Sequence, residues 1–294
     1  TTTSKVEAYN GSAWEQAGGV DAFSIEYFVI AGGGGGNTND DTTHGAGGAG
    51  GYLCNVNGEN SGGNTSAQPA MFLPKSTNLQ VTVGGGGGTN SVGSKSEFTS
   101  IMSIGGGKGA ETSNKSGSAG SPNGRTSGGP TAAITTQIAG QGSQSGEGVA
   151  VHGSGGAGGA GANGANGTNG VGGAGGAGLS SSITGSSVTR GGGGGGGGTT
   201  GGAGGSGGGG AGGSGINSNG TSGTVNTGGG GGGSGNGTGG TPGSGGSGVV
   251  ILRWATADAT IGATRTGLID GGVQTDGSDS YIEFTGGEGT ISFS

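Results

Sequence analysis

The chain has 294 residues, of which 93 are glycine, 26% are hydrophobic and only 9% are charged. This composition excludes an ordinary globular core over most of the length, because average proteins contain roughly 7% glycine and about 25% charged residues. The formal net charge is −7, and the nine Lys and Arg form no basic stripe, which argues against a nucleic-acid partner. No apolar run approaches the ~20 residues of a membrane span, so we expect none.

Residues 1–22 predict an N-terminal β-hairpin module. Two short polar–apolar runs flank Asn10-Gly11, a dipeptide that strongly favours a tight hairpin turn. Tyr9 and Trp14 would then face each other across the hairpin. The first residue is Thr1 rather than Met, which suggests processing or a segment of a longer product.

Residues 23–254 form a glycine-rich body that β-type runs bracket, FSIEYFVIAGGGGG at its start and GSGVVILRW at its end. Shorter runs of the same kind lie between them, in GYLCNV, LQVTV and SEFTSIMSI. Because these runs lead directly into glycine, we predict one small sheet whose strands continue as glycine segments. Its expected core residues are Phe28, Ile30, Val81, Val83, Phe98, Val250 and Leu252.

Glycine recurs in a single phase of three over residues 155–178 and again over 201–213. A polyproline-II-type helix has three residues per turn and no internal hydrogen bonds, so one residue of each triplet lines one edge. An edge made only of glycine lets a neighbouring backbone approach closely, and amides can then bond between helices. The predicted edge residues are Gly155, Gly158, Gly161, Gly164, Gly167, Gly170, Gly173 and Gly176, followed by Gly201, Gly204, Gly207, Gly210 and Gly213.

The run Gly191–Gly198 offers glycine in every phase, as an interior helix would need. Two other structures compete for these stretches. One is a flexible linker. The other is a collagen-like trimer, although the triplets of 155–178 contain no proline. Packed into a compact body, residues 155–178 should turn at least once, and we expect a turn around Asn163 to Asn169.

Residues 255–294 predict a C-terminal β module with strands around Tyr281–Phe284 and Thr290–Phe293, joined by Gly286–Gly289. No amphipathic helix pattern occurs, and glycine costs about 1 kcal/mol per helical position relative to alanine. The predicted fold class is therefore all-β with packed polyglycine-II-type helices, a small sheet bracketing a glycine-rich sandwich, and essentially no α-helix.

Residues that could carry chemistry are few, and we predict neither catalysis nor a cofactor. His44 near Asp40 and Asp41 suits a solvated loop better than a metal site, and Asp276 with Asp279 suits a turn better than a calcium site. The single cysteine, Cys54, is expected to be a small buried residue, and Trp254 to cover the core. Six N-x-S/T sequons occur, most of them expected by chance in this composition: Asn10, Asn64, Asn114, Asn166, Asn219 and Asn236.

The segments IEYFVIAGGGGG, GAGGAGGYL, VTVGGGGG, SEFTSIMSIGGGKGA and GGSGVVILRW occur in this order. Together they resemble the glycine-rich domains of bacteriophage tail fibres and related virion proteins, over about residues 23–254. The resemblance implies a non-enzymatic virion protein of a tail fibre or appendage that contributes to host attachment, related in composition to polyglycine-II tail-fibre adhesins. Residues 105–248 contain no Phe, Tyr or Trp, which favours a shaft or decoration over a tip adhesin.

The expected partners are other virion proteins or copies of the same chain, with a trimer favoured, and a glycan or protein of the host surface. The expected location is the virion, outside the cell. Two further hypotheses stay open: a bacterial surface protein that forms filaments by strand addition, and an ice-binding protein.

Overall fold

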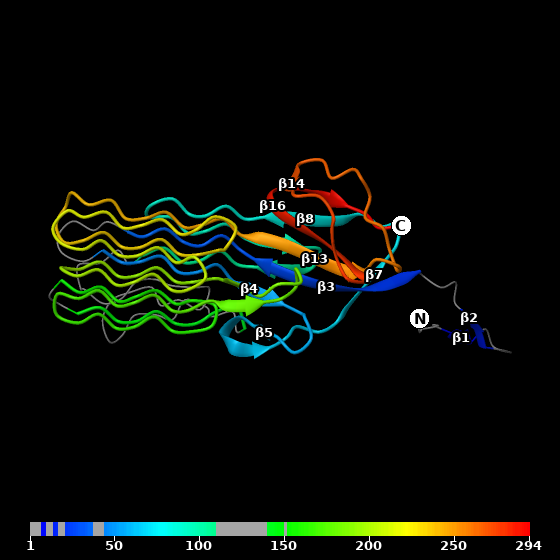
Figure 1. Ribbon diagram of the computed structural model, residues 1–294, viewed down its shortest axis with the longest axis horizontal. Coiled ribbons are helices and arrows are strands. Elements are labelled where there is room, and N and C mark those ends of the chain that lie inside the picture. The colour runs from blue at the N-terminus through cyan, green and yellow to red at the C-terminus, as the bar shows by residue number, and fades with distance from the viewer. Residues whose placement is uncertain (1–6, 10–13, 17–20, 38–43, 110–139, 150–151) are drawn as a thin grey trace.

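The computed structural model describes residues 7–9, 14–16, 21–37, 44–109, 140–149 and 152–294. Strands gather toward one end, and glycine segments run side by side from them to the opposite end (Figure 1). In the described residues there is no α-helix, only the three-residue 3-10 turn η1, so the predicted all-β class is confirmed. The strands are β1 (Glu7–Tyr9), β2 (Trp14–Gln16), β3 (Ala22–Ile30), β4 (Tyr52–Cys54), β5 (Asn60–Ser61), β6 (Thr65–Ser66), β7 (Met71–Pro74), β8 (Leu79–Val83), β9 (Ser96–Phe98), β10 (Ile101–Ser103), β11 (Leu179–Ser181), β12 (Val188–Arg190), β13 (Val249–Ala255), β14 (Leu268–Asp270), β15 (Gln274–Asp276) and β16 (Asp279–Ile291); η1 is Gly62–Asn64.

The main sheet is antiparallel and has the order β10-β9-β8-β16-β13-β3-β4. The long strand β16 lies at its centre, between β8 and β13, and also pairs with β14 and β15. The sequence predicts two strands joined by Gly286–Gly289, whereas these glycines are part of one continuous strand. Pairing explains the difference, because Gly287 lies opposite Val83 of β8 and opposite Leu268 of β14.

The side chain of Gln141 connects the two ends of this sheet. Its Oε1 accepts a hydrogen bond at 2.9 Å from the amide of Ile104, the residue after β10. Its Nε2 donates at 3.0 Å to the carbonyl of Met102 within β10. Its backbone carbonyl accepts from the amide of Tyr52 in β4 at 3.0 Å. Gln141 thus takes the place of a strand between β10 and β4, and the sheet is nearly closed.

Both faces of the sheet are covered where Tyr27–Ile30 of β3 pairs with Val249–Leu252 of β13, which accounts for the uninterrupted apolar runs at these positions. Successive residues of a strand point to opposite faces. Tyr27 and Val29 accordingly lie in one buried cluster, while Phe28 and Ile30 lie in a second cluster beside the glycine segments.

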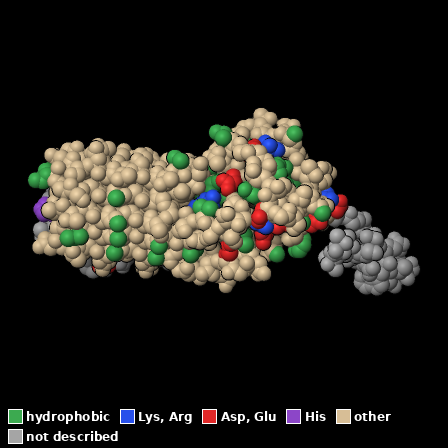
Figure 2. All heavy atoms as spheres, viewed as in Figure 1, with side chains coloured by type: hydrophobic (Ala, Val, Ile, Leu, Met, Phe, Trp, Pro, Cys, Tyr) green, Lys and Arg blue, Asp and Glu red, His purple; other side chains and the backbone are tan. Residues whose placement is uncertain are grey.

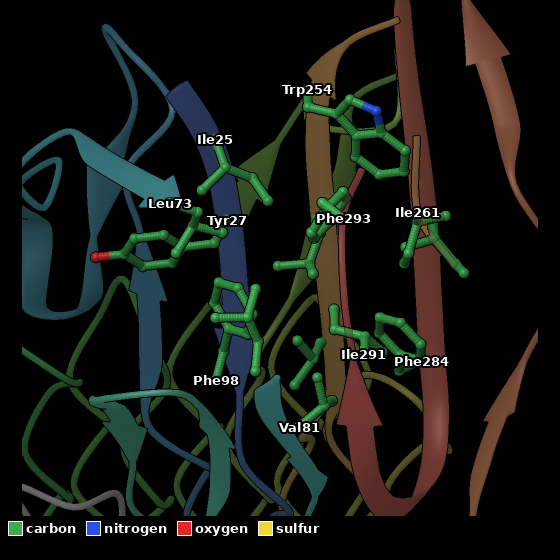
Figure 3. Packing of buried hydrophobic residues seen from close by; sticks show 14 of the residues in the cluster. Ile25, Tyr27, Leu73, Val81, Phe98, Trp254, Ile261, Phe284, Ile291 and Phe293 are labelled. Atoms are coloured by element: carbon green, nitrogen blue, oxygen red, sulfur yellow. The ribbon is translucent and has the colours of Figure 1, made fainter. Parts of the chain in front are cut away.

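Most of the core residues expected from the sequence lie in the first cluster, which Figure 3 shows between β3, β13 and the C-terminal strand. Val81, Phe98, Val250 and Leu252 are fully buried there, and Val83 packs against them partly buried. Trp254 covers one end of this cluster, where its ring meets Phe293 edge-on at 5.1 Å and its Nε1 donates to the carbonyl of Ala259.

The N-terminal hairpin is described only in its two strands. β1 and β2 pair antiparallel with Tyr9 opposite Trp14, as the sequence predicts. The expected Asn10-Gly11 turn lies outside the described residues. None of the described residues belongs to a helix long and apolar enough to cross a membrane.

Candidate functional site: the glycine bundle

The glycine bundle comprises the described glycine-rich segments 31–37, 44–51, 84–95, 104–109, 140–149, 152–178 and 191–248. Its construction is clearest at Gly32–Gly36, where every amide and every carbonyl is hydrogen-bonded to another segment. Partners repeat every third residue: Gly32 and Gly35 donate to the carbonyls of Ser94 and Ser91 at 3.0 and 2.9 Å. The partners lie in six surrounding stretches: 45–48, 87–90, 91–94, 106–109, residue 231 and 243–246.

The run Gly191–Gly198 has the same environment, and all of its residues are buried. Gly192 and Gly195 donate to the carbonyls of Gly207 and Gly210 at 3.1 and 2.8 Å. The remaining amides and carbonyls engage the other surrounding stretches, which gives six in all: 44–47, 154–160, 173–176, 202–205, 207–215 and 227–233. The sequence therefore identified this run correctly as an interior segment.

Absence of a Cβ is what allows this close approach. A Cβ on Gly34 would lie 2.1 Å from the carbonyl oxygen of Gly107, and one on Gly194 would lie 2.2 Å from that of Gly231. A glycine at the surface of such a run has room for a side chain: nothing lies within 4 Å of a Cβ placed on Gly88. Glycine is thus a steric requirement at the interior positions.

The structure places eleven of the thirteen predicted edge glycines with their Cβ positions against a neighbouring backbone oxygen, and the other two lie in turns. Gly170 and Gly207 have positive φ values, 76° and 92°, and lie in turns. At each of the other eleven positions a Cβ would lie 1.9 to 2.8 Å from a backbone oxygen of another segment or of the returning chain: Gly155, Gly158, Gly161, Gly164, Gly167, Gly173, Gly176, Gly201, Gly204, Gly210 and Gly213.

Residues 155–178 turn twice. The amide of Gly156 donates to the carbonyl of Ala165 at 2.9 Å, and that of Ala165 donates to the carbonyl of Ala174 at 2.8 Å, so three antiparallel passes lie side by side. The turns fall at residues 160–162 and at Asn169-Gly170. The region Asn163 to Asn169, where the sequence predicts a turn, thus contains one turn at its end, and most of its residues form an extended segment.

Surface passes contain a contact that the glycine pattern alone does not predict, which we call the Asn–Gly clamp. The amide of Gly164 donates to the carbonyl of Gln144 at 2.9 Å. Oδ1 of the preceding residue, Asn163, accepts from the amide of the same Gln144 at 2.9 Å. At the surface, a side-chain oxygen thus accepts the hydrogen bond of a backbone amide. In the interior of the bundle, a backbone carbonyl of another glycine segment does so.

The clamp recurs at intervals of three residues, in agreement with the period of the bundle. Four residue pairs form it: Asn163-Gly164 on Gln144, Asn166-Gly167 on Glu147, Asn219-Gly220 on Thr241, and Ser222-Gly223 on Ser244. Two of these asparagines belong to sequons, so their presence has a structural reason independent of glycosylation. The signal in the sequence is Asn or Ser before glycine, repeated at a spacing of three.

Replacing Asn163 by alanine should lower the free energy of unfolding by about 0.5–1.5 kcal/mol, because the amide of Gln144 loses its acceptor. Asn169→Ala is the matched control: Asn169 is exposed in the same stretch and makes no side-chain hydrogen bond within the described residues. Urea denaturation of both variants measures the difference. Equal midpoints would show that the clamp adds no stability.

His44 lies buried at the start of an interior pass, 2% exposed, with Nε2 2.9 Å from the carbonyl oxygen of Gly237. In the tautomer that carries the proton on Nε2, this nitrogen donates to Gly237. Burial lowers the pKa of His44 below its usual value. Asp40 and Asp41 lie outside the described residues, and within those residues no three potential metal ligands of the His, Cys, Asp and Glu types come together.

Acidification from pH 7.5 to 5.5 should therefore destabilise the folded chain through His44. The unfolded chain binds a proton near pH 6.5 while the folded chain resists it, so the stability present above about pH 6.5 falls as the pH drops below that value. The thermal midpoint at the two pH values measures this loss. A His44→Gln variant should show a smaller difference, and an unchanged difference would assign the effect to other groups.

Asp276 and Asp279 contact Arg253. Its Nη1 lies 3.1 Å from Asp276 Oδ2, and its Nη2 lies 2.7 Å from Asp279 Oδ2. Oε2 of Glu26 lies 3.9 Å from Nε of the same guanidinium. The Arg253 guanidinium thus neutralises the carboxylates of Asp276 and Asp279, the two residues considered above for a calcium site.

Cys54 lies in the second buried cluster, where Sγ contacts Oε2 of Glu59 at 3.4 Å. Burial raises the pKa of the Cys54 thiol to about 12, so the thiol stays protonated at neutral pH and acts as a packing residue. Arg190 is also buried, with its guanidinium 5.4 Å from the centre of the Phe28 ring and 3.8 Å from Glu283. The contacts of Arg190 join β12, which leads directly into Gly191–Gly198, to β3 and β16 of the main sheet.

The sequence pattern of a glycine-rich domain family matches residues 8–255, which includes both bracketing strands and the whole bundle. The chain belongs to this glycine-rich domain family. No curated protein and no solved structure gives a significant match. In this glycine-rich domain, most charged side chains on the face shown in Figure 2 lie over the strands, and the part of that face formed by the bundle is largely uncharged.

Proposed function

We propose that this glycine-rich domain protein is a non-enzymatic structural component of a phage virion, part of a tail fibre or appendage that contributes to host attachment. Its glycine segments would adopt the polyglycine-II conformation. It would act outside the cell, joined to other virion proteins or to copies of itself, with a trimer favoured. The end of the bundle that lies opposite the strands would face a glycan or protein of the host surface.

The observation that carries this proposal is the packing of interior segments such as Gly32–Gly36, each bonded to six surrounding stretches. An extended rod that satisfies its own backbone needs no large apolar core and offers a protease few free strands. The order of the bracketing segments supports the virion assignment, because it resembles that of glycine-rich tail-fibre domains.

Two experiments test the proposal at its two levels. For the conformation, a polyproline-II signal in circular dichroism together with slow digestion by proteinase K is expected. A coil spectrum with rapid digestion would contradict packed glycine helices.

For the function, mass spectrometry of purified phage particles from the source strain should find the chain, and antibodies against it should label the tail. The purified protein should also compete with the particles for adsorption to host cells. Detection on the bacterial surface without phage particles would favour the filament-forming alternative.

A further inference from the structure

Five of the six Asn-Gly pairs in the described residues fall into two groups. In the three Asn–Gly clamps, which begin at Asn163, Asn166 and Asn219, the glycine amide donates to a neighbouring carbonyl at 2.7 to 2.9 Å. In the turns at Asn57-Gly58 and Asn169-Gly170, the glycine has a positive φ, 81° and 76°. Within the described residues, neither turn glycine donates its amide to a hydrogen bond.

This difference matters because Asn-Gly pairs can deamidate without an enzyme. The glycine nitrogen, having lost its proton, attacks Cγ of the asparagine, and a new N–Cγ bond forms. The Cγ–Nδ2 bond breaks and the side-chain nitrogen leaves as ammonia. Water then opens the cyclic imide at either carbonyl, which yields aspartate or isoaspartate.

We infer that Asn57 and Asn169 are sites of spontaneous deamidation in the folded protein, and that the clamps protect Asn163, Asn166 and Asn219. The clamp opposes the reaction at both reacting groups. The glycine N–H is engaged by the neighbouring carbonyl, and Oδ1 holds the asparagine carboxamide against the neighbouring amide, at 2.9 Å for Asn163.

Packing of the glycine adds a second barrier at the clamps. A Cβ on Gly164 would lie 2.0 Å from the carbonyl oxygen of Gly156, and one on Gly220 would lie 2.4 Å from that of Gly232. The backbone therefore has little room to rotate into a ring. At Gly58, by contrast, nothing lies within 4 Å of a Cβ position.

Solvent exposure does not explain the distinction, because all five asparagines are exposed.

Asn236-Gly237 falls in neither group. Its glycine has a φ of 90°, but Nδ2 of Asn236 donates to Oγ1 of Thr199 at 2.9 Å. Conversion of Asn169 would add a carboxylate to the turn at Asn169-Gly170. The inference itself does not depend on the proposed function.

The test is to incubate the full-length folded protein at mildly alkaline pH and to locate amide-to-acid conversion by tandem mass spectrometry. The three clamped asparagines should convert at least about tenfold more slowly than Asn57 and Asn169, because two hydrogen bonds must open first. In denaturant the five rates should converge. Equal rates in the folded protein, or a difference that persists in denaturant, would overturn the inference.

A designed pair provides a second test. Ser222 precedes glycine in the same clamp geometry, with Oγ 3.1 Å from the amide nitrogen of Ser244. The variant Ser222→Asn creates a new Asn-Gly sequence in that clamp, and its asparagine should be as slow to convert as Asn219. Conversion as fast as at Asn57 in the folded variant would show that the clamp does not protect. The variant Asn57→Gln should abolish the modification at residue 57 and serves as the assignment control.

Discussion

Alanine at Gly194 is expected to lower the free energy of unfolding by about 3 kcal/mol or more. The added methyl group would lie 2.2 Å from the carbonyl oxygen of Gly231 and 3.0 Å from that of Gly47, in two different neighbouring segments. Backbone atoms in a packed bundle cannot move aside as a flexible side chain can, so the segments would have to separate. Guanidinium denaturation followed by circular dichroism measures the loss.

Gly88→Ala is the matched control for this substitution. Gly88 also belongs to a glycine run, but nothing lies within 4 Å of its Cβ position and its φ is not positive. Alanine there should be neutral or slightly stabilising, because it restricts the unfolded chain. An alanine scan of residues 84–88 should be tolerated only at Gly85 and Gly88, three residues apart. Equal effects at Gly194 and Gly88 would indicate a flexible linker.

Phe284→Ala is expected to lower the free energy of unfolding by about 3–5 kcal/mol, because it leaves a cavity in the first buried cluster. Phe284 is fully buried in β16, opposite Val250 of β13 and among the residues shown in Figure 3. Thr290→Ala in the same strand is the control, since that side chain is exposed and should change stability by less than about 0.5 kcal/mol.

The same variant tests whether the sheet and the bundle unfold together. Strands β3 and β8 continue directly into glycine segments, and β13 directly follows one, so the sheet fixes one end of each of these segments. Thermal unfolding of Phe284→Ala, followed by tryptophan fluorescence and by the far-ultraviolet signal of the bundle, should give one common midpoint. Two separate midpoints would show that the bundle holds its structure without the sheet.

Local patterns in the sequence were sufficient where one residue type determines the structure. The apolar runs of β3 and β13 predict two strands that pair in the sheet, and glycine in every phase of 191–198 predicts an interior segment. Both features depend on side-chain size and burial along a single stretch, which can be recognised without knowing what the stretch packs against.

Features that depend on distant partners could not be derived in this way. Gly286–Gly289 has the composition of a turn, yet pairing with β8 and β14 keeps it in a strand. Gln141 is an ordinary polar residue in the sequence, and only the folded chain places it between β10 and β4. The Asn–Gly clamps fall between these cases, because their spacing of three is visible but the residues they hold are not.

The bundle is assembled from contacts between residues far apart in the chain: the amide of Gly33, for example, donates to the carbonyl of Gly246 at 2.9 Å. An interior segment gains its hydrogen bonds only when most of its surrounding stretches have arrived, so loop-closure entropy must be overcome before the bonds compensate for it. Such a chain should fold slowly, and the reverse reaction should also be slow, because no segment can leave without breaking bonds to several others. The protein would then persist for long periods through a high barrier to unfolding, whatever its equilibrium stability.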